Sequence, residues 1–376
     1  MHSELKVARL FDGEQWQHNV AIRWQDGQII ELLPCDASEV SAGTLVPGFI
    51  DLQVNGGGGA LFNTATSQQT LATMMQAHAR FGSTAMLPTV ITDSISTMQQ
   101  AADVIAMAIR EQQPGILGVH FEGPHLSVPK RGVHPTEHIR SLSADELAIY
   151  QRNDLGIKLL TVAPENIAPE HIRQLVELGV IVFLGHSNAD AATVQAALAV
   201  GATGFTHLYN AMSPLTSREP GMVGVALADP HSWCGIILDG HHVHPVAAKL
   251  ALAAKPRGKL VLVTDAMSPV GTDDTEFDFF SGKVHRDGSK LTNDAGSLAG
   301  SVLDMAAAVR YAVNTLDIEL GEAVRMASLY PAQAIGCDAE RGRLLPGFKA
   351  DMVLLDDALY CQKSWLHGKP TAALKA

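Results

Sequence analysis

Residues 158–164 read KLLTVAP, residues 180–187 read VIVFLGHS, and residues 201–210 read GATGFTHLYN. Each is a short run of apolar, often β-branched residues that ends in polar residues and is bounded by the turn-forming residues Gly, Pro or Asn. Runs of this kind are typical of strands that are buried on both faces, as in parallel sheets. Because Ala-rich, helix-like stretches separate such runs, the pattern predicts repeated β–α–β units.

The same pattern extends along the chain in both directions. Five further candidate strands are LVPGFIDLQV (45–54), TAMLPTV (84–90), GILGVHFEG (115–123), WCGIILDG (233–240) and KLVLVTDA (259–266). The stretches at 67–82 and 96–113 have the apolar spacing of amphipathic helices. Eight strands that alternate with helices predict an α/β fold of the (β/α)8 TIM-barrel type. A doubly wound open sheet is the alternative, but no GxGxxG follows the first strand and polar residues collect at the strand ends.

The two ends of the chain have a different pattern. Residues 1–46 contain KVARLFDG and HNVAIRWQDGQIIELLP, and residues 342–376 contain GRLLPGFKADMVLL, all with the turn signals of short antiparallel strands. Neither end has enough apolar residues to fold alone, and both are too apolar to be solvated tails. We therefore expect the ends to pair into one small, discontinuous β-sandwich domain beside a barrel domain at 47–341.

Composition restricts the class of function. Hydrophobic residues make up 47% of the 376 residues and charged residues 18%, which suits a large core. The formal net charge is -12, and an acidic chain without a basic run is a poor candidate for binding nucleic acid or an anionic membrane. If the substrate is an anion, a few well-placed cations must bind it.

Cysteine usage and the N-terminal sequence bear on location. Cys35, Cys234, Cys337 and Cys361 are scattered and form no CxxC pair, which argues against a disulfide framework and against a thiolate zinc site. The first residues, MHSELKVARL, have no apolar signal-peptide core, and no stretch has the roughly 18 apolar residues that a membrane span needs. We therefore predict a cytoplasmic location.

Polar side chains follow the predicted strands at the end where barrel enzymes place their sites. Glu122 ends the third strand, His186 the fifth and His207 the sixth. Two imidazoles and a carboxylate from nearby strands form a zinc-type ligand set that leaves a coordination position open for water. His120 lies on the same strand face as Glu122 and is expected to be a neighbour of the metal rather than a ligand.

Asp265, at the end of the eighth strand, is the candidate general base. A carboxylate there can take a proton from an attacking water and deliver it to a leaving amine, which typically contributes ~10²–10⁴-fold in rate. The alternative is an aspartate that only orients a ligand histidine.

Eight motifs in order resemble one enzyme family. They are PGFIDLQVNG (47–56), HFEGPHL (120–126), GHS (185–187), THLYNAM (206–212), DGHHVHP (239–245), VTDAMSP (263–269), GSLAGS (296–301) and SLYPAQAIG (328–336). Together they resemble the N-acetylglucosamine-6-phosphate deacetylases of the amidohydrolase superfamily, over nearly the whole chain. The resemblance implies hydrolysis of the acetamide of N-acetyl-D-glucosamine 6-phosphate to D-glucosamine 6-phosphate and acetate.

The resemblance also implies roles for individual residues. Glu122, His186 and His207 would bind the metal, and Asp265 would be the catalytic acid and base. His134, in the RGVH loop, would polarise the substrate carbonyl. The remaining implied substrate contacts are Val133, Asn210, Ala211, Arg218, His242 and, in the acetyl pocket, Leu298. Arg218 would reach the site of a neighbouring subunit, so a homodimer is expected.

One departure from the superfamily concerns the number of metal ions. Many amidohydrolases have HxH on the first strand and a bridging lysine on the fourth, which together hold a second ion. This chain has Gln53 and Asn55 at those strand positions and no lysine in TVAPE. Neutral amides are poor ligands for a divalent ion, so the two residues are interpreted as vestigial second-metal positions. We expect one ion per subunit, with zinc as the first candidate and iron, cobalt or manganese as alternatives.

Two rival functions use the same residues. A cyclic-amide hydrolase of the dihydroorotase kind would need the absent HxH and lysine, and it would give Arg218 and His242 no task. A catalytically inactive sugar-phosphate-binding protein would be expected to have lost a ligand or the base, whereas all four residues are present.

Overall fold

The core of the molecule is an eight-stranded parallel sheet, seen in a computed structural model that describes residues 2–280 and 282–371. Its strands follow one another in chain order: β5 (Phe49–Val54), β8 (Ser83–Ile91), β9 (Gly118–Glu122), β10 (Ile157–Val162), β11 (Val180–Leu184), β12 (Gly204–Phe205), β13 (Trp233–Ile236) and β14 (Leu260–Leu262). A parallel bridge between Val54 and Ala266 joins the last segment to the first and closes the barrel. The predicted barrel is therefore confirmed, and the open sheet is excluded.

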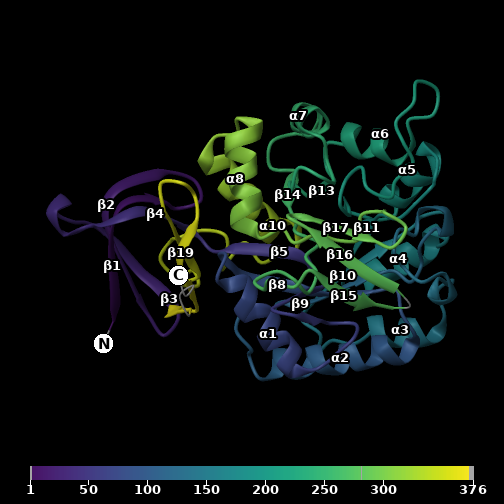
Figure 1. The fold of residues 1–376 in the computed structure, drawn as a ribbon, viewed down its shortest axis with the longest axis horizontal. Coiled ribbons are helices and arrows are strands. Elements are labelled where there is room, and N and C mark those ends of the chain that lie inside the picture. Colours follow the sequence, from purple (N-terminus) through teal and green to yellow (C-terminus); the bar gives the residue numbers. More distant parts are fainter. Residues whose placement is uncertain (1, 281, 372–376) are drawn as a thin grey trace.

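Helices cover the outside of this barrel (Figure 1). They are α1 (Gln68–Ala79), α2 (Ile95–Arg110), α3 (Ala144–Tyr150), α4 (Pro169–Glu177), α5 (Ala191–Ala199), α6 (Gly221–Ala228), α7 (Pro245–Ala254), α8 (Met305–Leu316), α9 (Leu320–Ala327) and α10 (Leu329–Ala334). The first two are the helices predicted from spacing. Each begins at a serine, Ser67 or Ser94, whose hydroxyl accepts a hydrogen bond from a backbone N–H of the first turn. None of the described helices is long and apolar enough to cross a membrane.

The two chain ends meet in a second sheet, whose purple and yellow strands lie together in Figure 1. Its seven strands are, in spatial order, β20 (Lys369–Pro370), β19 (Cys361–Leu366), β18 (Met352–Leu355), β4 (Ser41–Pro47), β1 (Ser3–Phe11), β2 (Trp16–Gln25) and β3 (Gln28–Pro34). β4 and β18 pair antiparallel and so join the two ends. The predicted small β domain is present. Its strands are hydrogen-bonded into one continuous sheet that folds over on itself, because Trp24 of β2 and Trp365 of β19, far apart in the strand order, pack with ring centroids 6.4 Å apart.

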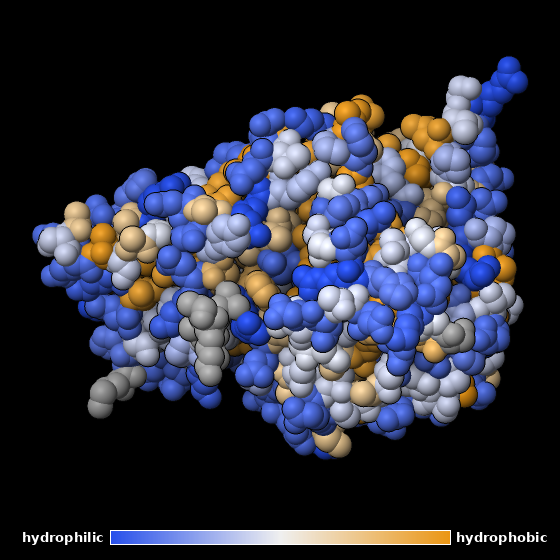
Figure 2. All heavy atoms as spheres, viewed as in Figure 1, coloured by the Kyte–Doolittle hydropathy of each residue, from blue (hydrophilic) through white to orange (hydrophobic). Residues whose placement is uncertain are grey.

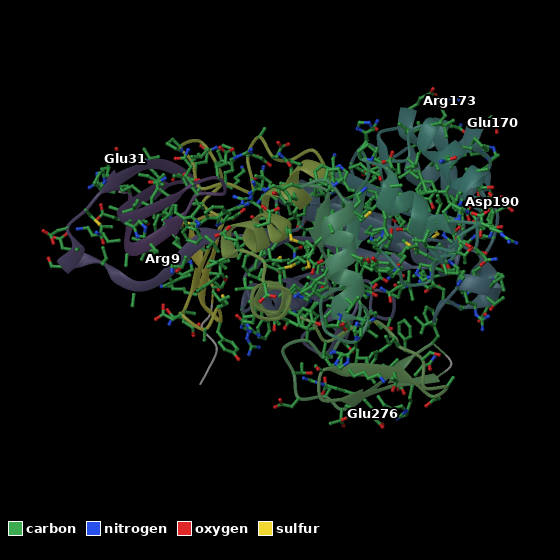
Figure 3. All side chains as sticks on the ribbon, turned by 90° about the horizontal axis from the view of Figure 1, so that it is seen from above. Arg9, Glu31, Glu170, Arg173, Asp190 and Glu276 are labelled. Atoms are coloured by element: carbon green, nitrogen blue, oxygen red, sulfur yellow. The ribbon has the colours of Figure 1, made fainter. Side chains whose placement is uncertain are left out.

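A three-stranded antiparallel sheet that we did not predict follows β14. It consists of β15 (Glu276–Phe279), β16 (Gly282–Asp287) and β17 (Lys290–Asn293), and Figure 3 shows it, beside the label of Glu276, as a separate layer on one side of the barrel. Phe279, Val284 and Leu291 are buried against apolar residues of the barrel loops, among them Ile91 and Met267. Because those two residues lie at or beyond strand ends, this sheet covers the carboxyl end of the barrel. A short pair, β6 (Gly56–Gly57) and β7 (Ala60–Leu61), lies after β5.

Candidate metal centre and catalytic site

Three potential ligands meet at the carboxyl end of the barrel. Glu122 is the last residue of β9, and His186 and His207 each lie two residues beyond the ends of β11 and β12. Oε1 of Glu122 is 3.1 Å from Nε2 of His186 and 3.0 Å from Nε2 of His207, and the two Nε2 atoms are 3.0 Å apart. All three side chains are buried.

This cluster fits a divalent metal ion. Tetrahedral coordination with bonds of about 2.0–2.1 Å separates ligand atoms by about 3.3 Å, close to the spacing found here. Nδ1 of His186 is 2.9 Å from the Lys130 carbonyl and donates to it, which leaves the lone pair of Nε2 free for an ion. Burial alone would raise the pKa of Glu122, but the neighbouring imidazoles of His186 and His207 outweigh it and hold that pKa well below its usual range. The third ligand is therefore a carboxylate.

Asp265 lies beside this cluster, three residues after β14. Burial, together with the charge of Glu122, raises the pKa of Asp265 to about 6. Its Oδ1 accepts a hydrogen bond of 2.6 Å from Nδ2 of Asn55 and one of 3.2 Å from Nε2 of Gln53. Oδ1 is thus occupied by two donors, and Oδ2 is the oxygen free to exchange a proton.

His134 also lies beside the ligands, with its ring centroid 4.4 Å from that of His186. Its Nδ1 accepts a hydrogen bond from the backbone N–H of Thr92 at 3.3 Å, and the Thr92 hydroxyl is 2.9 Å away. A neutral imidazole that accepts at Nδ1 carries its proton on Nε2, and this Nε2 is 3.8 Å from Oε2 of Glu122. Burial, aided by the nearby His186, lowers the pKa of His134 to about 3. His134 is therefore a neutral donor directed at the ligand cluster.

One cavity of about 190 Å³ connects these groups. It is lined by Asn55, Ile91, Glu122, Gly132, Val133, His134, His186, His207, Asn210, Ala211, Ile237, His242, Asp265, Met267, Phe279, Leu298 and Gly300. Three of the residues named from the sequence lie outside this lining: His120, Gln53 and Arg218. His120 is buried, with its Nε2 2.7 Å from the Thr161 hydroxyl. Gln53 is buried and contacts Glu122 and Asp265, whereas Arg218 lies outside, in an exposed loop at 214–219.

Several site residues have a strained backbone. His186, His207 and Asp265 have φ values of 48°, 35° and 51°, in the left-handed region that L-residues rarely adopt. Such conformations cost about 1–3 kcal/mol each and persist only where the surroundings hold them. Asp265 is held from both sides, because its N–H donates to Gln53 O and its carbonyl accepts from Ser301 N.

Comparison with known proteins agrees with this geometry. The amidohydrolase family model matches residues 44–374. This chain belongs to the amidohydrolase family. It is 57% identical over 330 residues to an N-acetylgalactosamine-6-phosphate deacetylase of Shewanella sp. (strain ANA-3), covering 88% of this chain and 84% of that protein. A protein of the same name from Escherichia coli O157:H7 is 37% identical over 375 residues, 97% of this chain and 98% of that one.

The solved structures include a close match. The crystal structure of an N-acetylglucosamine-6-phosphate deacetylase from Pasteurella multocida superimposes with a TM-score of 0.94 at 34% identity, over 99% of this chain and 100% of that one. Membership of the amidohydrolase family makes this chain a hydrolytic enzyme, and the family and the Glu122–His186–His207 cluster together indicate a divalent metal ion.

Three residues of this amidohydrolase site were missed in the sequence. Thr92, which fixes the ring of His134, is a polar residue just beyond a predicted strand and so carried a signal. Asp239 is the first residue of the DGHHVHP motif and was given no role, but its Oδ2 is 2.6 Å from Nδ1 of His242 and orients that ring. Phe279 lies in the unpredicted sheet. The sequence feature that could have predicted this sheet is the Asp287–Gly288 pair, which lies between two segments of alternating apolar and polar residues and favours a β-hairpin.

Proposed function

We propose that this chain hydrolyses the acetamide of N-acetyl-D-glucosamine 6-phosphate to D-glucosamine 6-phosphate and acetate. The observation that carries the proposal is the single cavity in which Asp265 and a neutral His134 flank the ligand cluster. The N-acetyl-D-galactosamine epimer is the second candidate, because the 57% identical relative bears that name. The two sugars differ only at C4, so one set of acetamide-cleaving groups serves both.

The reaction assigns one task to each side chain. A divalent ion held by Glu122, His186 and His207 would polarise the acetamide carbonyl and lower the pKa of the attacking water. Oδ2 of Asp265 accepts the proton of that water as its oxygen bonds to the carbonyl carbon. His134 donates from Nε2 to the developing oxyanion. Asp265 then returns the proton to the nitrogen as the C–N bond breaks, which releases acetate and the amine.

We further propose one ion per chain, with zinc as the first candidate and iron, cobalt or manganese as alternatives. Gln53 and Asn55 support a single ion, because both amides donate hydrogen bonds to carboxylates and neutral amides are poor ligands for a divalent ion. The acetyl group would lie against Val133 and Leu298, both in the cavity wall.

The phosphate would be bound from two subunits. Asn210, Ala211 and His242 line the cavity of their own chain, and we propose that Arg218 enters the cavity of a partner in a homodimer. Hydrogen bonds between Thr216 and Glu219 form a tight turn with Arg218 inside it. The loop before α6 is the teal projection in Figure 1 and stands clear of the body in Figure 2, with hydrophilic residues at its tip. A cytoplasmic location is also proposed, since all four cysteines are free.

Acetate release tests the function. Purified protein with saturating metal is given the N-acetyl forms of glucosamine and galactosamine, each with and without the 6-phosphate. We expect kcat/KM to be far higher for the phosphorylated sugars, and the ratio between the two phosphorylated epimers decides which is the substrate. If no phosphorylated sugar released acetate while a cyclic amide was opened, the chain would be an amidohydrolase of the rival class.

A further inference from the structure

We propose that Gln53 is a positioning residue whose side-chain amide takes the place of a second cation between the carboxylates of Glu122 and Asp265. This inference rests on the proposed function, because it assigns Asp265 as the proton carrier. It gives Gln53 an active task at a position that the sequence suggested was only vestigial.

The contacts of one nitrogen atom carry the inference. Nε2 of Gln53 is 2.9 Å from Oε1 of Glu122 and 3.2 Å from Oδ1 of Asp265. A primary amide has two N–H donors, one for each carboxylate. The reverse orientation would turn the amide oxygen toward two anions, so only the donor end fits. Gln53 is 2% exposed, and bulk water cannot replace it.

The charges explain why a donor is needed there. Two like charges close together in a site of low dielectric repel each other strongly, and Glu122 must remain a carboxylate to serve as a ligand. An amide that donates to both anions offsets part of this repulsion without binding as a ligand itself. Asn55 adds a further donor, at 2.6 Å from Oδ1 of Asp265. Together the two amides fix Oδ1 and leave Oδ2 for the proton transfer.

The backbone around Gln53 holds the amide in place. Its carbonyl accepts from the N–H of Asp265 at 3.0 Å, and its own N–H donates to Oδ1 of Asp51 at 3.2 Å. The strand that carries the amide is therefore bonded directly to the residue that the amide positions. A change at residue 53 should act on Asp265 and the ion, with no direct effect on groups that contact the sugar phosphate.

Two substitutions at Gln53 test the proposal. Gln53→Met keeps the length of the side chain but removes both donors, and it should lower kcat and ion affinity by about 10–100-fold with KM within about threefold of wild type. Gln53→Glu places a third carboxylate between the other two. On titration of the metal-loaded protein with Zn²⁺, this variant should bind one ion more per chain than wild type does.

The control is Thr89→Val, a buried change on the neighbouring strand that removes the acceptor of the Val54 N–H bond. It should lower Tm with little effect on kcat, on ion affinity or on the number of ions bound per chain. Unchanged kcat and ion affinity in Gln53→Met, or an unchanged ion count in Gln53→Glu, would overturn the proposal. The ion measurements need no substrate, so they decide the role of Gln53 even if wild type fails to release acetate and the proposed function is wrong.

Discussion

Asp265 has an unusual combination of backbone and side-chain constraints. Its φ is 51°, two amides hold Oδ1, and Oδ2 is left free beside the ligand cluster. We predict that Asp265→Asn keeps metal and substrate binding but lowers kcat by at least about 10²-fold, because an amide cannot accept and return a proton. Acetate-release kinetics and calorimetric titration with the substrate measure the two effects. A variant that retained more than about a tenth of the wild-type rate would contradict the general-base role.

Asp51 is a buried carboxylate that the proposed reaction does not use. Burial, only partly offset by hydrogen bonds from Thr264 and the Gln53 N–H, raises the pKa of Asp51 to about 7. The folded state therefore holds a proton that the unfolded chain has lost, and stability should fall as pH rises from about 4 to about 7. The gap between the two pKa values corresponds to at most ~4 kcal/mol.

The test at this position is Asp51→Asn. The amide carries no charge, and the Thr264 hydroxyl can reverse its hydrogen bond to meet the new N–H donor. The variant should therefore gain stability relative to wild type as pH rises through this range, measured as the difference in Tm at constant metal concentration. A Tm difference that does not change between pH 4 and pH 8 would show that Asp51 is ionised in the folded protein.

At the scale of elements, the three-stranded sheet shapes the substrate cavity. Phe279 is 9% exposed, packs with the apolar cluster of the barrel loops and lines the cavity together with Leu298. Phe279→Ala should enlarge the acyl side of the cavity and raise the rate for an N-propionyl substrate relative to N-acetyl by about 10-fold, the usual effect of one methylene. Phe277→Ala, on the same strand but outside the cavity lining, is the control. If Phe279→Ala and Phe277→Ala had the same ratio of N-propionyl to N-acetyl rates, the acyl group would not lie against Phe279.

Sequence patterns predicted some elements far better than others. Strands such as β8 and β9 were found because strands buried on both faces are continuous apolar runs with polar residues just beyond them. The same logic placed Glu122, His186 and Asp265 at one end of the barrel. The left-handed φ values and the bridging amide of Gln53 depend on tertiary hydrogen bonds between distant strands, which no local pattern encodes.

At the scale of the molecule, the cavity of a single chain is lined by few cationic side chains that could bind a phosphate. Arg218 stands outside the cavity of its own chain, in the projecting loop. We predict that Arg218→Ala raises KM for the phosphorylated sugar and changes little for the unphosphorylated one. Mixing Arg218→Ala with Asp265→Asn chains should restore activity, because a hybrid dimer regains one complete site. If subunits exchange and no activity returns, Arg218 does not act across an interface.

Deacetylation should require a single divalent ion held by Glu122, His186 and His207. The most direct test is elemental analysis of the purified protein paired with acetate release at increasing metal occupancy. We expect activity to rise in proportion to occupancy and to saturate at one ion per chain, and we expect His186→Asn to lose both the ion and the activity. Full activity in the chelated, metal-free protein, or activity that requires two ions per chain, would contradict the requirement for a single ion.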